Sequence, residues 1–597
     1  MPSLNKYTLL LVVIATLALA TAQQSYDFIV VGGGTAGIAV AVRLSQKLID
    51  SSILLIEAGP DGRDVPAIYT PGHRGSALGS IYDWNFTTTP QPYANDRVIT
   101  QNRGKVLGGS SALNLEAWDR GVKADYDAWE ELGNPGWNWT TIHAAMKAQE
   151  TFQITPTKGE DGIVGVGTQG PIHFLVNRFS PAQQELFFPS MQNLGLNETH
   201  TFLDGDMVGY MRHTSMILGS NYTRSYSPAF LPLAGPNLHL LLGTMVAKIN
   251  LNKSSCATGV TLTNGTVILA KKEVILSAGS IQSPQLLELS GVGSKSVLEA
   301  AGIKQLVDLP GVGENLQDHV RITTAYQLES NYTSPDELRF NATFVAEQLA
   351  LYEANKTSFY DETSSGYAYG TWQQMTGNNS YFVALAKEAA NSSNLVDQKK
   401  LENLEDLSKR VPQLEVLFDD GYLGNKGYPV INSSLYGAQF FTLIASINHG
   451  YARGSVHINS SDVAKHPVLN PNYLSNEYDL QAVAQGAKFL RKIAYTEPFR
   501  SAIVDEYEPG LDTVSTDADW VEYAKANVLT IWHPLGTCAL LPREEGGVVD
   551  PELRVYGVTG LRVVDASVIP ILVSGHIQTS VYAIAERAAE MIGAQWS

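Results

Sequence analysis

The segment that most constrains the fold is residues 26–46, YDFIVVGGGTAGIAVAVRLSQ. It runs from a short apolar, β-branched stretch through a glycine-rich turn into small and apolar residues at helical spacing. Such apolar stretches are typical of strands buried in parallel sheets. A second one, SSILLIEAG at residues 51–59, ends in an acidic residue. Strand, helix and strand together predict a βαβ unit, and therefore an α/β fold with a parallel sheet.

The turn of this unit contains three spaced glycines, Gly32, Gly34 and Gly37, in the pattern GxGxxG. The first permits the tight turn, the second lets the backbone approach a pyrophosphate, and the third lets the helix pack on the strand. Glu57 ends the next strand, where a carboxylate accepts hydrogen bonds from ribose hydroxyls and disfavours the 2′-phosphate of NADP. The pattern predicts a dinucleotide site and leaves NAD and FAD open.

The charge balance narrows the classes of partner. The formal net charge is −18, and an acidic surface is repelled by nucleic acid and by anionic membranes. Only Cys256 and Cys538 are present, so the fold does not rest on a disulfide framework. No CxxC, HxxxH or HExxH pattern predicts a metal site. We therefore expect a small-molecule substrate and, for any redox reaction, an organic cofactor.

The first 22 residues have the pattern of a signal peptide. MPSLNK precedes the apolar run YTLLLVVIATLALATA, whose last three residues are small, as at a cleavage site. The run is too short to span a bilayer comfortably, so we expect no stable membrane association. Asn-x-Ser/Thr sequons recur along the chain, which favours a secreted, N-glycosylated protein. They include Asn85, Asn138, Asn197, Asn221, Asn252, Asn264, Asn331, Asn341 and Asn355.

Further strand-like runs lie at residues 238–251, 272–279 and 561–567. After about residue 330 the pattern changes to polar, sequon-bearing, helix-like stretches. The run QFFTLIASINHGYARGSVHIN that follows is typical of antiparallel strands. We predict a nucleotide-binding part at 26–325, an α+β substrate-binding domain with an antiparallel sheet at 326–520, and a return to the first part at 521–597.

The stretch RGKVLGGSSALN, residues 103–114, contains a turn whose backbone N–H groups and hydroxyls suit a phosphate or a flavin edge. It resembles the first signature of the glucose-methanol-choline (GMC) oxidoreductases. GSIQSPQLLELSGVG at 279–293 matches their second signature, and DLPGVGENLQDH at 308–319 is similar to the segment that follows it. With YGVTGLRVVDASVIP and SGHIQTSVYAIAERAAEMI near the end, the resemblance runs from Tyr26 to about Ile592. It implies a Rossmann-like FAD-binding domain and FAD as the cofactor.

The resemblance also implies which residues hold FAD, with Thr35, Ala36 and Glu57 at the ADP half. The full set of expected cofactor contacts is Gly32, Gly34, Thr35, Ala36, Gly37, Glu57, Ala58, Arg103, Val106, Gly108, Gly109, Ser110, Asn114, Leu115, Val246, Asp565, Ala566, His576, Ile577 and Gln578.

For four of these residues the resemblance implies a more specific contact. Val246 is expected at the adenine, and Asp565 with Ala566 at the diphosphate and the ribityl chain. Asn114 and its neighbours are expected to line the flavin ring. Some family members attach FAD through a histidine just before that asparagine. The equivalent residue is Leu113, which implies non-covalent binding.

The resemblance assigns the catalytic pair to His533, in HPLGT, and His576. An imidazole with a pKa near neutrality takes the proton of an alcohol while N5 of the flavin takes the hydride. The second imidazole then hydrogen-bonds the developing alkoxide, and its charge favours electron transfer to O₂. His319, in the QDH segment, is expected to have a structural role.

The residues before the predicted base indicate the substrate. Sugar-oxidising members carry Arg and Asn where LTIWH has Leu529 and Ile531, and a polar substrate loses affinity without such groups. The stretch is similar to TIFH of aryl-alcohol oxidases and of secreted fungal enzymes such as patulin synthase. We therefore expect Ile531 and Trp532 in the substrate pocket and a primary aryl or apolar alcohol as substrate, with O₂ or a quinone as acceptor.

Two alternatives remain open. One is a glucose or oligosaccharide dehydrogenase or oxidase that contacts hydroxyls through residues of the second domain. LGNPGWNW and REEGGVVD are similar to stretches of sugar-oxidising members. The other is a non-redox cyclase of fungal secondary metabolism with the same fold.

Overall fold

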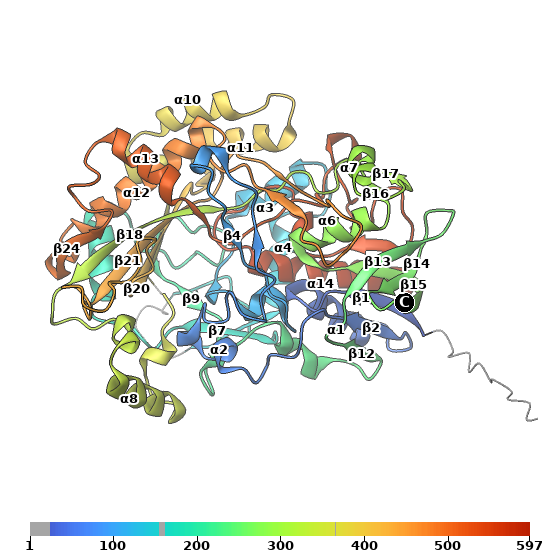
Figure 1. The fold of residues 1–597 in the computed structure, drawn as a ribbon, viewed down its shortest axis with the longest axis horizontal. Helices are drawn as coiled ribbons and strands as arrows, with labels where there is room; N and C mark the ends of the chain where they lie inside the picture. The colour runs from blue at the N-terminus through green and yellow to red at the C-terminus, as the bar shows by residue number, and fades with distance from the viewer. Residues whose placement is uncertain (1–23, 155–161, 365) are drawn as a thin grey trace, which may run out of the picture.

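The computed structural model describes residues 24–154, 162–364 and 366–597. The predicted signal peptide, residues 1–22, lies outside them. Two regions stand side by side, one around a mainly parallel sheet and one around an antiparallel sheet (Figure 1). Within the described ranges, no helix is both long and apolar enough to cross a membrane.

The first sheet confirms the predicted α/β fold. Its order is β12-β2-β1-β15-β14-β13, with β26 beside β15. The pairs of β1 with β2 and β15, of β2 with β12, and of β15 with β26 are parallel, and β13 and β14 form an antiparallel extension. The strands are β1 (Ser25–Val31), β2 (Ile53–Ile56), β12 (Leu238–Leu241), β13 (Val246–Leu251), β14 (Ala257–Leu262), β15 (Val267–Leu276) and β26 (Leu561–Val563).

The predicted βαβ unit consists of β1, α1 (Thr35–Lys47) and β2. The run 238–251, expected as one strand, forms β12 and β13 on opposite edges of the sheet. The C-terminal helix α14 (Gln578–Trp596) packs on α1 and on α4 (Trp139–Ala148). The last segment of the chain therefore completes the first region.

The second sheet has the order β24-β18-β21-β20-β19-β8, with β25 beside β18, and its pairs are antiparallel. Since β8 and most of β18 precede residue 326, this sheet draws strands from both sides of the expected boundary, and the limits 326–520 stay a prediction. The strands are β8 (Gly209–Arg212), β18 (Val320–Leu328), β19 (Gly366–Gly370), β20 (Leu414–Asp420), β21 (Phe440–Ile447), β24 (Ile503–Glu508) and β25 (Leu529–Thr530).

One face of the antiparallel sheet is covered by α12 (Glu477–Ala494). Asn476 caps this helix by accepting a hydrogen bond from the N–H of Asp479, and Arg491 lies in its last turn, where a cation favours the helix dipole. Leu490 and other apolar residues of α12 are fully buried, which contributes about 1.5–3 kcal/mol for each large side chain. The opposite face of the sheet is left to line a cavity.

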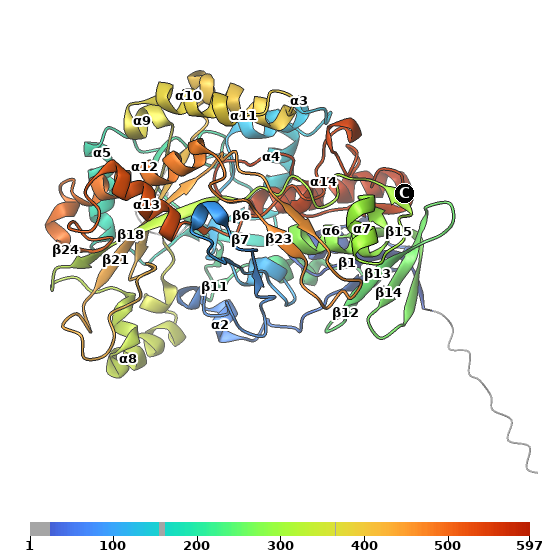
Figure 2. The ribbon, with the colours of Figure 1, turned by 45° about the horizontal axis from the view of Figure 1, so that its top comes forward.

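The remaining elements are shorter or lie at the periphery, with α9, α10 and α11 along the top in Figure 2. The remaining helices are α2 (Pro66–Tyr69), α3 (Lys123–Glu131), α5 (Phe187–Asn193), α6 (Gly279–Leu289), α7 (Lys295–Ala300), α8 (Ala342–Glu353), α9 (Trp372–Thr376), α10 (Asn379–Ala389), α11 (Leu395–Glu405) and α13 (Asp517–Asn527). The small sheets contain β3 (Phe86–Thr87), β4 (Thr100–Gln101), β5 (Ala117–Trp118), β6 (Glu150–Phe152), β7 (Ile172–Val176), β9 (Thr214–Ser215), β10 (Ile217–Leu218), β11 (Thr223–Arg224), β16 (Val292–Gly293), β17 (Val307–Asp308), β22 (Ser455–His457) and β23 (Val468–Asn470).

The run QFFTLIASINHGYARGSVHIN contains two antiparallel strands that do not pair with each other. β21 lies between β18 and β20, whereas β22 pairs with β23. The antiparallel prediction is confirmed, and the structure adds that the two strands belong to different sheets.

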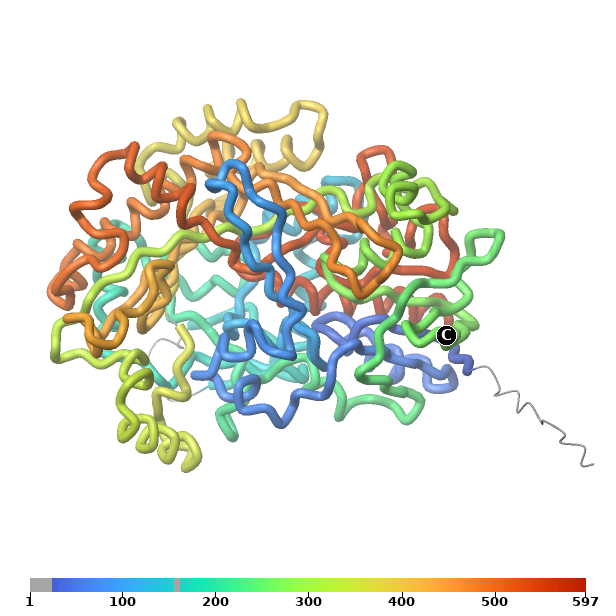
Figure 3. The backbone as a smooth tube through the Cα atoms, in the orientation of Figure 1, coloured from blue at the N-terminus to red at the C-terminus, as the bar shows by residue number. Residues whose placement is uncertain are grey.

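A long excursion after β2, drawn in blue, crosses the front of the molecule from the first region to the second (Figure 3). At its far end the short 3-10 helix Pro92–Ala94 packs on α13. Arg97 Nη1 donates a hydrogen bond of 2.9 Å to the carbonyl of Val528. The segment that precedes the predicted base is thereby tied to the excursion.

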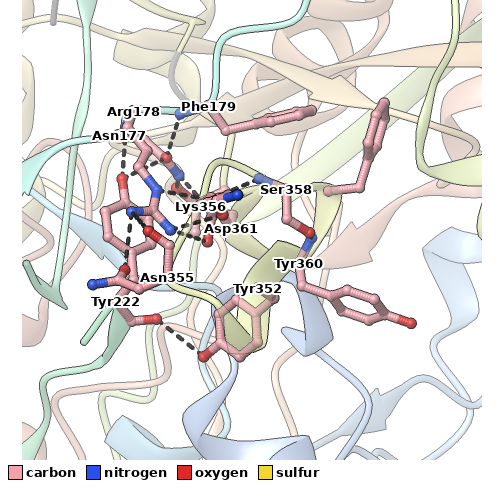
Figure 4. Close-up of polar contacts among 12 residues, drawn as sticks. Asn177, Arg178, Phe179, Tyr222, Tyr352, Asn355, Lys356, Ser358, Tyr360 and Asp361 are labelled. Carbon is pink, nitrogen blue, oxygen red and sulfur yellow. Dashed lines mark hydrogen bonds and ion pairs between the residues drawn. The ribbon is translucent and has the colours of Figure 1, made fainter. Parts of the chain in front are cut away.

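Helix α8 is attached differently, because none of its residues is buried. The segment after it is held by Arg178, whose Nε lies 2.8 Å from Oδ2 of Asp361 and whose Nη1 lies 3.1 Å from Oδ1 of Asn355 (Figure 4). The same guanidinium lies 3.7 Å from the ring centroid of Tyr222. Polar and cation–π contacts therefore anchor this part of the chain.

Candidate active site

A cavity of about 680 Å³ extends between the two sheets. One wall consists of the turns that follow the carboxyl ends of β1 and β2, together with the start of α14. The other wall is the open face of the antiparallel sheet. Ligands of α/β proteins bind at such strand ends.

Most of the predicted cofactor residues line this cavity. They are Gly32, Gly34, Thr35, Ala36, Glu57, Ala58, Arg103, Gly109, Ser110, Asn114, Leu115, Val246, Asp565, Ala566, His576, Ile577 and Gln578. Gly37, Val106 and Gly108 are not part of its lining. Val106 is fully buried in the core, and Gly108 donates its N–H to the carbonyl of Gly33. The roles of the lining residues toward a cofactor stay predictions.

Each glycine of the first turn has its own structural explanation. Gly32 has a φ of +104°, a conformation that side chains disfavour. A Cβ on Gly37 would lie 1.8 Å from the carbonyl oxygen of Gly32, so the helix packs on the turn only with glycine there. A Cβ on Gly34 would have Gly109 Cα as its nearest neighbour, at 3.7 Å, because this residue borders the cavity. The two glycine turns meet at Gly34 and Gly109 and present backbone there, as a pyrophosphate requires.

Glu57 is buried at the adenosine end of the predicted site. Its Oε2 accepts a hydrogen bond of 2.7 Å from Gly33 N–H, and its Oε1 accepts one of 2.7 Å from Gly59 N–H. Burial raises the pKa of Glu57 to about 7, although these N–H donors act in the opposite direction. Each oxygen keeps a lone pair for a further donor. The geometry therefore fits a ribose diol.

The two predicted catalytic histidines meet at the other end of the cavity. Their ring centroids lie 5.0 Å apart and the ring planes are 81° to each other. His533 follows β25, and His576 precedes α14. Both line the cavity. Residues 43 positions apart in sequence are thus brought into one site by the return of the chain to the first region.

His319 determines which nitrogen of His533 carries a proton. Nε2 of His319 lies 2.9 Å from the carbonyl oxygen of Asn448, which only accepts, so this nitrogen is protonated. Burial lowers the pKa of His319 to about 3, so the ring is neutral and its Nδ1 is an acceptor. Nδ1 of His533, at 2.9 Å, must then be the donor. This leaves Nε2 of His533 with a free lone pair, as a base requires.

The backbone before His533 is strained. Trp532 has a φ of +64°, an uncommon conformation for a bulky residue, which costs about 1–3 kcal/mol. Its N–H donates to Oγ1 of Thr530 at 2.6 Å, and its carbonyl accepts from Nη2 of Arg103 at 2.5 Å. Asp318 accepts from the N–H of His533 at 2.9 Å. These bonds hold Trp532 and His533 at the cavity wall.

His576 lies against buried carboxylates. Its Nδ1 is 3.0 Å from Oδ2 of Asp119 and 3.6 Å from Oε1 of Glu415. Burial disfavours the charged form of His576, but these carboxylates outweigh it and raise its pKa to about 9. Burial and the charge of His576 keep the pKa of His533 well below its usual range. Near neutral pH the pair therefore consists of a neutral His533 and a cationic His576.

Asp119 also accepts hydrogen bonds from Nε2 of His213 at 2.9 Å and from the hydroxyl of Tyr369 at 2.7 Å. Asp119, His213 and His576 lie close enough to share a metal ion. In the structure the atoms that would bind one are joined by His–carboxylate hydrogen bonds, so the group serves the charge of His576.

Known proteins resemble this chain over most of its length. Two family profiles, both described as GMC oxidoreductase, match residues 26–321 and 450–585. The GMC oxidoreductase family protein Mala s 12 of Malassezia sympodialis is 34% identical to this chain, covering 95% of it and 92% of the relative. The chain belongs to the GMC oxidoreductase family. It is therefore an FAD-dependent oxidoreductase acting on alcohol or sugar CH–OH groups.

Two further GMC proteins are informative. Patulin synthase of Aspergillus clavatus is 33% identical to this chain, covering 95% of it and 91% of the relative. The solved structure of a fungal aryl-alcohol oxidase superimposes with a TM-score of 0.82 at 27% identity, covering 96% of this chain and 100% of the other. The expected family and fold are confirmed.

The roles of some site residues could not be predicted from the sequence. Asp119 follows β5 outside any motif, and His319, for which a structural role was expected, contacts His533. Ile531 and Trp532 line the cavity, and their contact with a substrate stays a prediction. Cys538 is a buried free thiol. For His319, the available hint was the similarity of the segment 308–319 to one of the GMC family.

Proposed function

We propose that this GMC oxidoreductase oxidises primary aryl alcohols to aldehydes, with His533 as the base and with O₂ or a quinone as final acceptor. The observation that carries the proposal is the free lone pair on Nε2 of His533, at the cavity wall beside His576. FAD, when bound, accepts the hydride that leaves the alcohol carbon.

His533 takes the hydroxyl proton at Nε2. Its partner His319 keeps Nδ1 of His533 in the donor state, so that the accepting nitrogen faces the cavity. Low basicity from burial is offset as the alkoxide forms, because the new imidazolium and the developing negative charge attract each other. The proton transfer therefore needs a neutral His533 at the start.

His576 supplies positive charge from the other side. Its Nδ1 is engaged by Asp119, so its Nε2–H is left to donate to the alcohol oxygen. A charged donor placed before the reaction stabilises the alkoxide more than the neutral alcohol, which lowers the barrier. Asp119 and Glu415 keep that charge in place.

The wall next to the base supports an aromatic substrate. Ile531 and Trp532 border the cavity directly before His533, and Leu417 and Ile444 contribute from the antiparallel sheet. An aromatic ring buries its faces against such side chains. The aryl-alcohol oxidase and patulin synthase, similar to this chain over nearly its whole length, are in accord with this substrate class.

The test is anaerobic mixing of the FAD-loaded enzyme with benzyl-type alcohols and with glucose. We expect benzyl-type alcohols to bleach the flavin absorption near about 450 nm. Parallel recording of peroxide release and of quinone-dye reduction identifies the acceptor. A strong preference for glucose, or an oxidised spectrum across the alcohol panel, contradicts the proposal; the second result favours the cyclase.

A sugar is the second candidate, because part of the cavity lining is polar and charged. Arg74, Glu362 and Asp419 belong to this part and form buried ion pairs of 2.8 and 3.0 Å. Such groups can bind hydroxyls at a distance from the base. Glucose in the same panel decides between the two candidates.

We also propose that the protein is secreted and N-glycosylated and binds FAD without a covalent bond. In support, none of the sequon asparagines named above is buried, and Leu113 occupies the position of the linking histidine. N-terminal sequencing of protein from culture medium should start near residue 23, and glycosidase treatment should lower its apparent mass. Acid precipitation should release the flavin into the supernatant.

A further inference from the structure

One buried arginine in the cavity lacks the partners that buried arginines normally have. Arg321 lies in β18, opposite Ser446 of β21 and Leu529 of β25. Side chains alternate between the two faces of a strand. Its neighbour Ile322 packs into the core beneath α12, whereas Arg321 lines the cavity. The guanidinium therefore belongs to the substrate wall of the antiparallel sheet.

The hydrogen bonds of Arg321 are incomplete. Its Nε donates to the carbonyl of Thr530 at 3.3 Å, while Nη1 is buried without a partner among the described residues. The side chain is 7% exposed, and within the described ranges no carboxylate lies within the 4.0 Å of an ion pair. A buried guanidinium with too few acceptors is costly, and a ligand that supplies acceptors would offset that cost.

Other buried arginines show what is missing. Arg120 is paired with Glu150 at 2.7 Å, and Arg562 with Glu273 at 2.7 Å. The carboxylate whose charge acts on Arg321 is Asp419, which already accepts from Arg74 and from Ser364. Arg321 is thus a cavity cation without an ion-pair partner among the described residues. Arg103, which also lines the cavity and makes no ion pair within the described ranges, differs because it donates to the carbonyls of Asn102 and Trp532.

Arg321 lies close to the segment that carries the predicted base. Its guanidinium carbon lies 5.6 Å from the ring centroid of Trp532, the residue before His533. A substrate that reaches His533 along this wall meets two kinds of group. Apolar side chains such as Trp532 suit an aromatic ring, and the cation of Arg321 suits an anion. Arginine binds carboxylates through two parallel hydrogen bonds.

We propose that Arg321 binds a carboxylate of the substrate, so that the preferred substrates are primary aryl alcohols bearing an acid group on the ring. This inference rests on the proposed oxidation of aryl alcohols and names the substrate class within it. Two acidic side chains of the cavity lining are compatible with such an anion, because burial raises the pKa of Glu362 to about 7 and that of Asp420 well above its usual range.

The experiment compares 3- and 4-(hydroxymethyl)benzoate with 4-isopropylbenzyl alcohol, a neutral molecule of similar shape. We expect the FAD-loaded wild type to have a higher kcat/KM for at least one of the acids. Arg321→Met should raise the KM for that acid by roughly 10- to 100-fold, as expected for a lost charged hydrogen-bond pair, and change the KM for the neutral alcohol by less than about threefold. Arg321→Lys should recover part of the loss.

The matched control is Arg212→Met. Arg212 lies in β8 of the same sheet, is paired with Glu185, and does not line the cavity. The Arg212→Met substitution removes the same charge from the sheet as Arg321→Met, and we expect it to leave the KM values for the acid and for the neutral alcohol unchanged. A wild type that prefers the neutral alcohol, or an Arg321→Met enzyme that loses both substrates equally, overturns the proposal.

Binding is measured separately from turnover. 4-Methylbenzoate cannot be oxidised at an alcohol group, and its binding to the FAD-loaded enzyme is followed by the shift of the flavin spectrum. Tight binding to the wild type that Arg321→Met abolishes supports the carboxylate site even if no alcohol is oxidised, in which case only the proposed function fails. Equal binding to both enzymes overturns the site.

Discussion

The two walls of the cavity belong to the two regions that stand side by side in Figure 1. At the parallel sheet, glycine turns around Gly34 and Gly109 present backbone and leave room for a ligand. At the antiparallel sheet, alternate side chains such as Arg321, Ile444 and Asp419 form the wall. A backbone wall tolerates few changes and serves a constant ligand, whereas a side-chain wall changes with each substitution. Cofactor retention and substrate choice should therefore respond to separate sets of residues.

The largest expected effect tests the backbone wall. Gly37→Ala places a Cβ 1.8 Å from the carbonyl oxygen of Gly32, so α1 must move away from the turn. We expect destabilisation by about 3 kcal/mol or more and loss of FAD. Flavin absorbance per protein and thermal unfolding measure both.

The matched control is Gly302→Ala. Gly302 has a φ of +72°, and among the described residues no atom lies within 4 Å of the position that its Cβ would take. This substitution should cost only the roughly 1–2 kcal/mol of the left-handed backbone and retain FAD. A stable Gly37→Ala protein with full FAD content contradicts the assignment of this wall.

The second effect concerns the reacting end, where both walls meet. His533→Ala removes the base and should lower kcat/KM for a benzyl-type alcohol by roughly 10²- to 10⁴-fold. FAD content should not change, because the glycine turns are untouched. His239→Ala, at an exposed position of β12, is the control and should behave as the wild type. Steady-state kinetics that show less than a tenfold loss for His533→Ala would exclude it as the base.

The third effect separates positioning from chemistry. His319→Phe removes the acceptor that holds Nδ1 of His533 in the donor state. We expect kcat to fall by roughly 10- to 100-fold, less than the loss caused by a wrong tautomer in serine proteases. His319→Gln should recover part of the activity, because its amide oxygen can accept from His533. If the two variants lose kcat equally, His319 acts only through packing.

The smallest effect is a change of pH dependence. Because His533 must be neutral, kcat/KM should fall as the pH drops below the depressed pKa of His533. Because His576 must be charged, kcat/KM should also fall as the pH rises through about 9. Asp119→Asn removes the carboxylate that raises the pKa of His576 and should move the alkaline limb down by about one to two pH units.

Glu415→Gln provides a graded comparison for this limb. Its carboxylate lies 3.6 Å from Nδ1 of His576, against 3.0 Å for Asp119, so its replacement should shift the limb less. Full pH profiles of kcat/KM measure both shifts. A folded, FAD-loaded Asp119→Asn enzyme with the wild-type alkaline limb would show that His576 is not the group that titrates.

Local patterns were sufficient to predict the first region. The βαβ unit and the glycine turn depend on residues near each other in the chain, and both are present as expected. The second region was predicted less completely, since β8 and β18 of its sheet come largely from before residue 326. Strand pairing between distant segments leaves no periodic pattern that a single sequence reveals.

The candidate site divides in the same way. His533 and His576 were identified because each lies in a contiguous motif of the GMC family. Asp119 and Arg321 were not, since their importance comes from what lies beside them after folding. A lone acidic or basic residue in a sequence is far more often exposed than buried and unpaired.

The sequence by itself determined the parallel sheet and the glycine turn, and its resemblance to the GMC oxidoreductases predicted the family and the histidine pair. Only the tertiary structure decided how these histidines share their protons, because the tautomer of His533 depends on His319 and the charge of His576 on Asp119. It alone decided that Arg321 faces the cavity without a countercharge among the described residues. The sequence specifies the chemical groups. Their pKa values, tautomers and unpaired charges depend on distances and burial, which are set only when the chain folds.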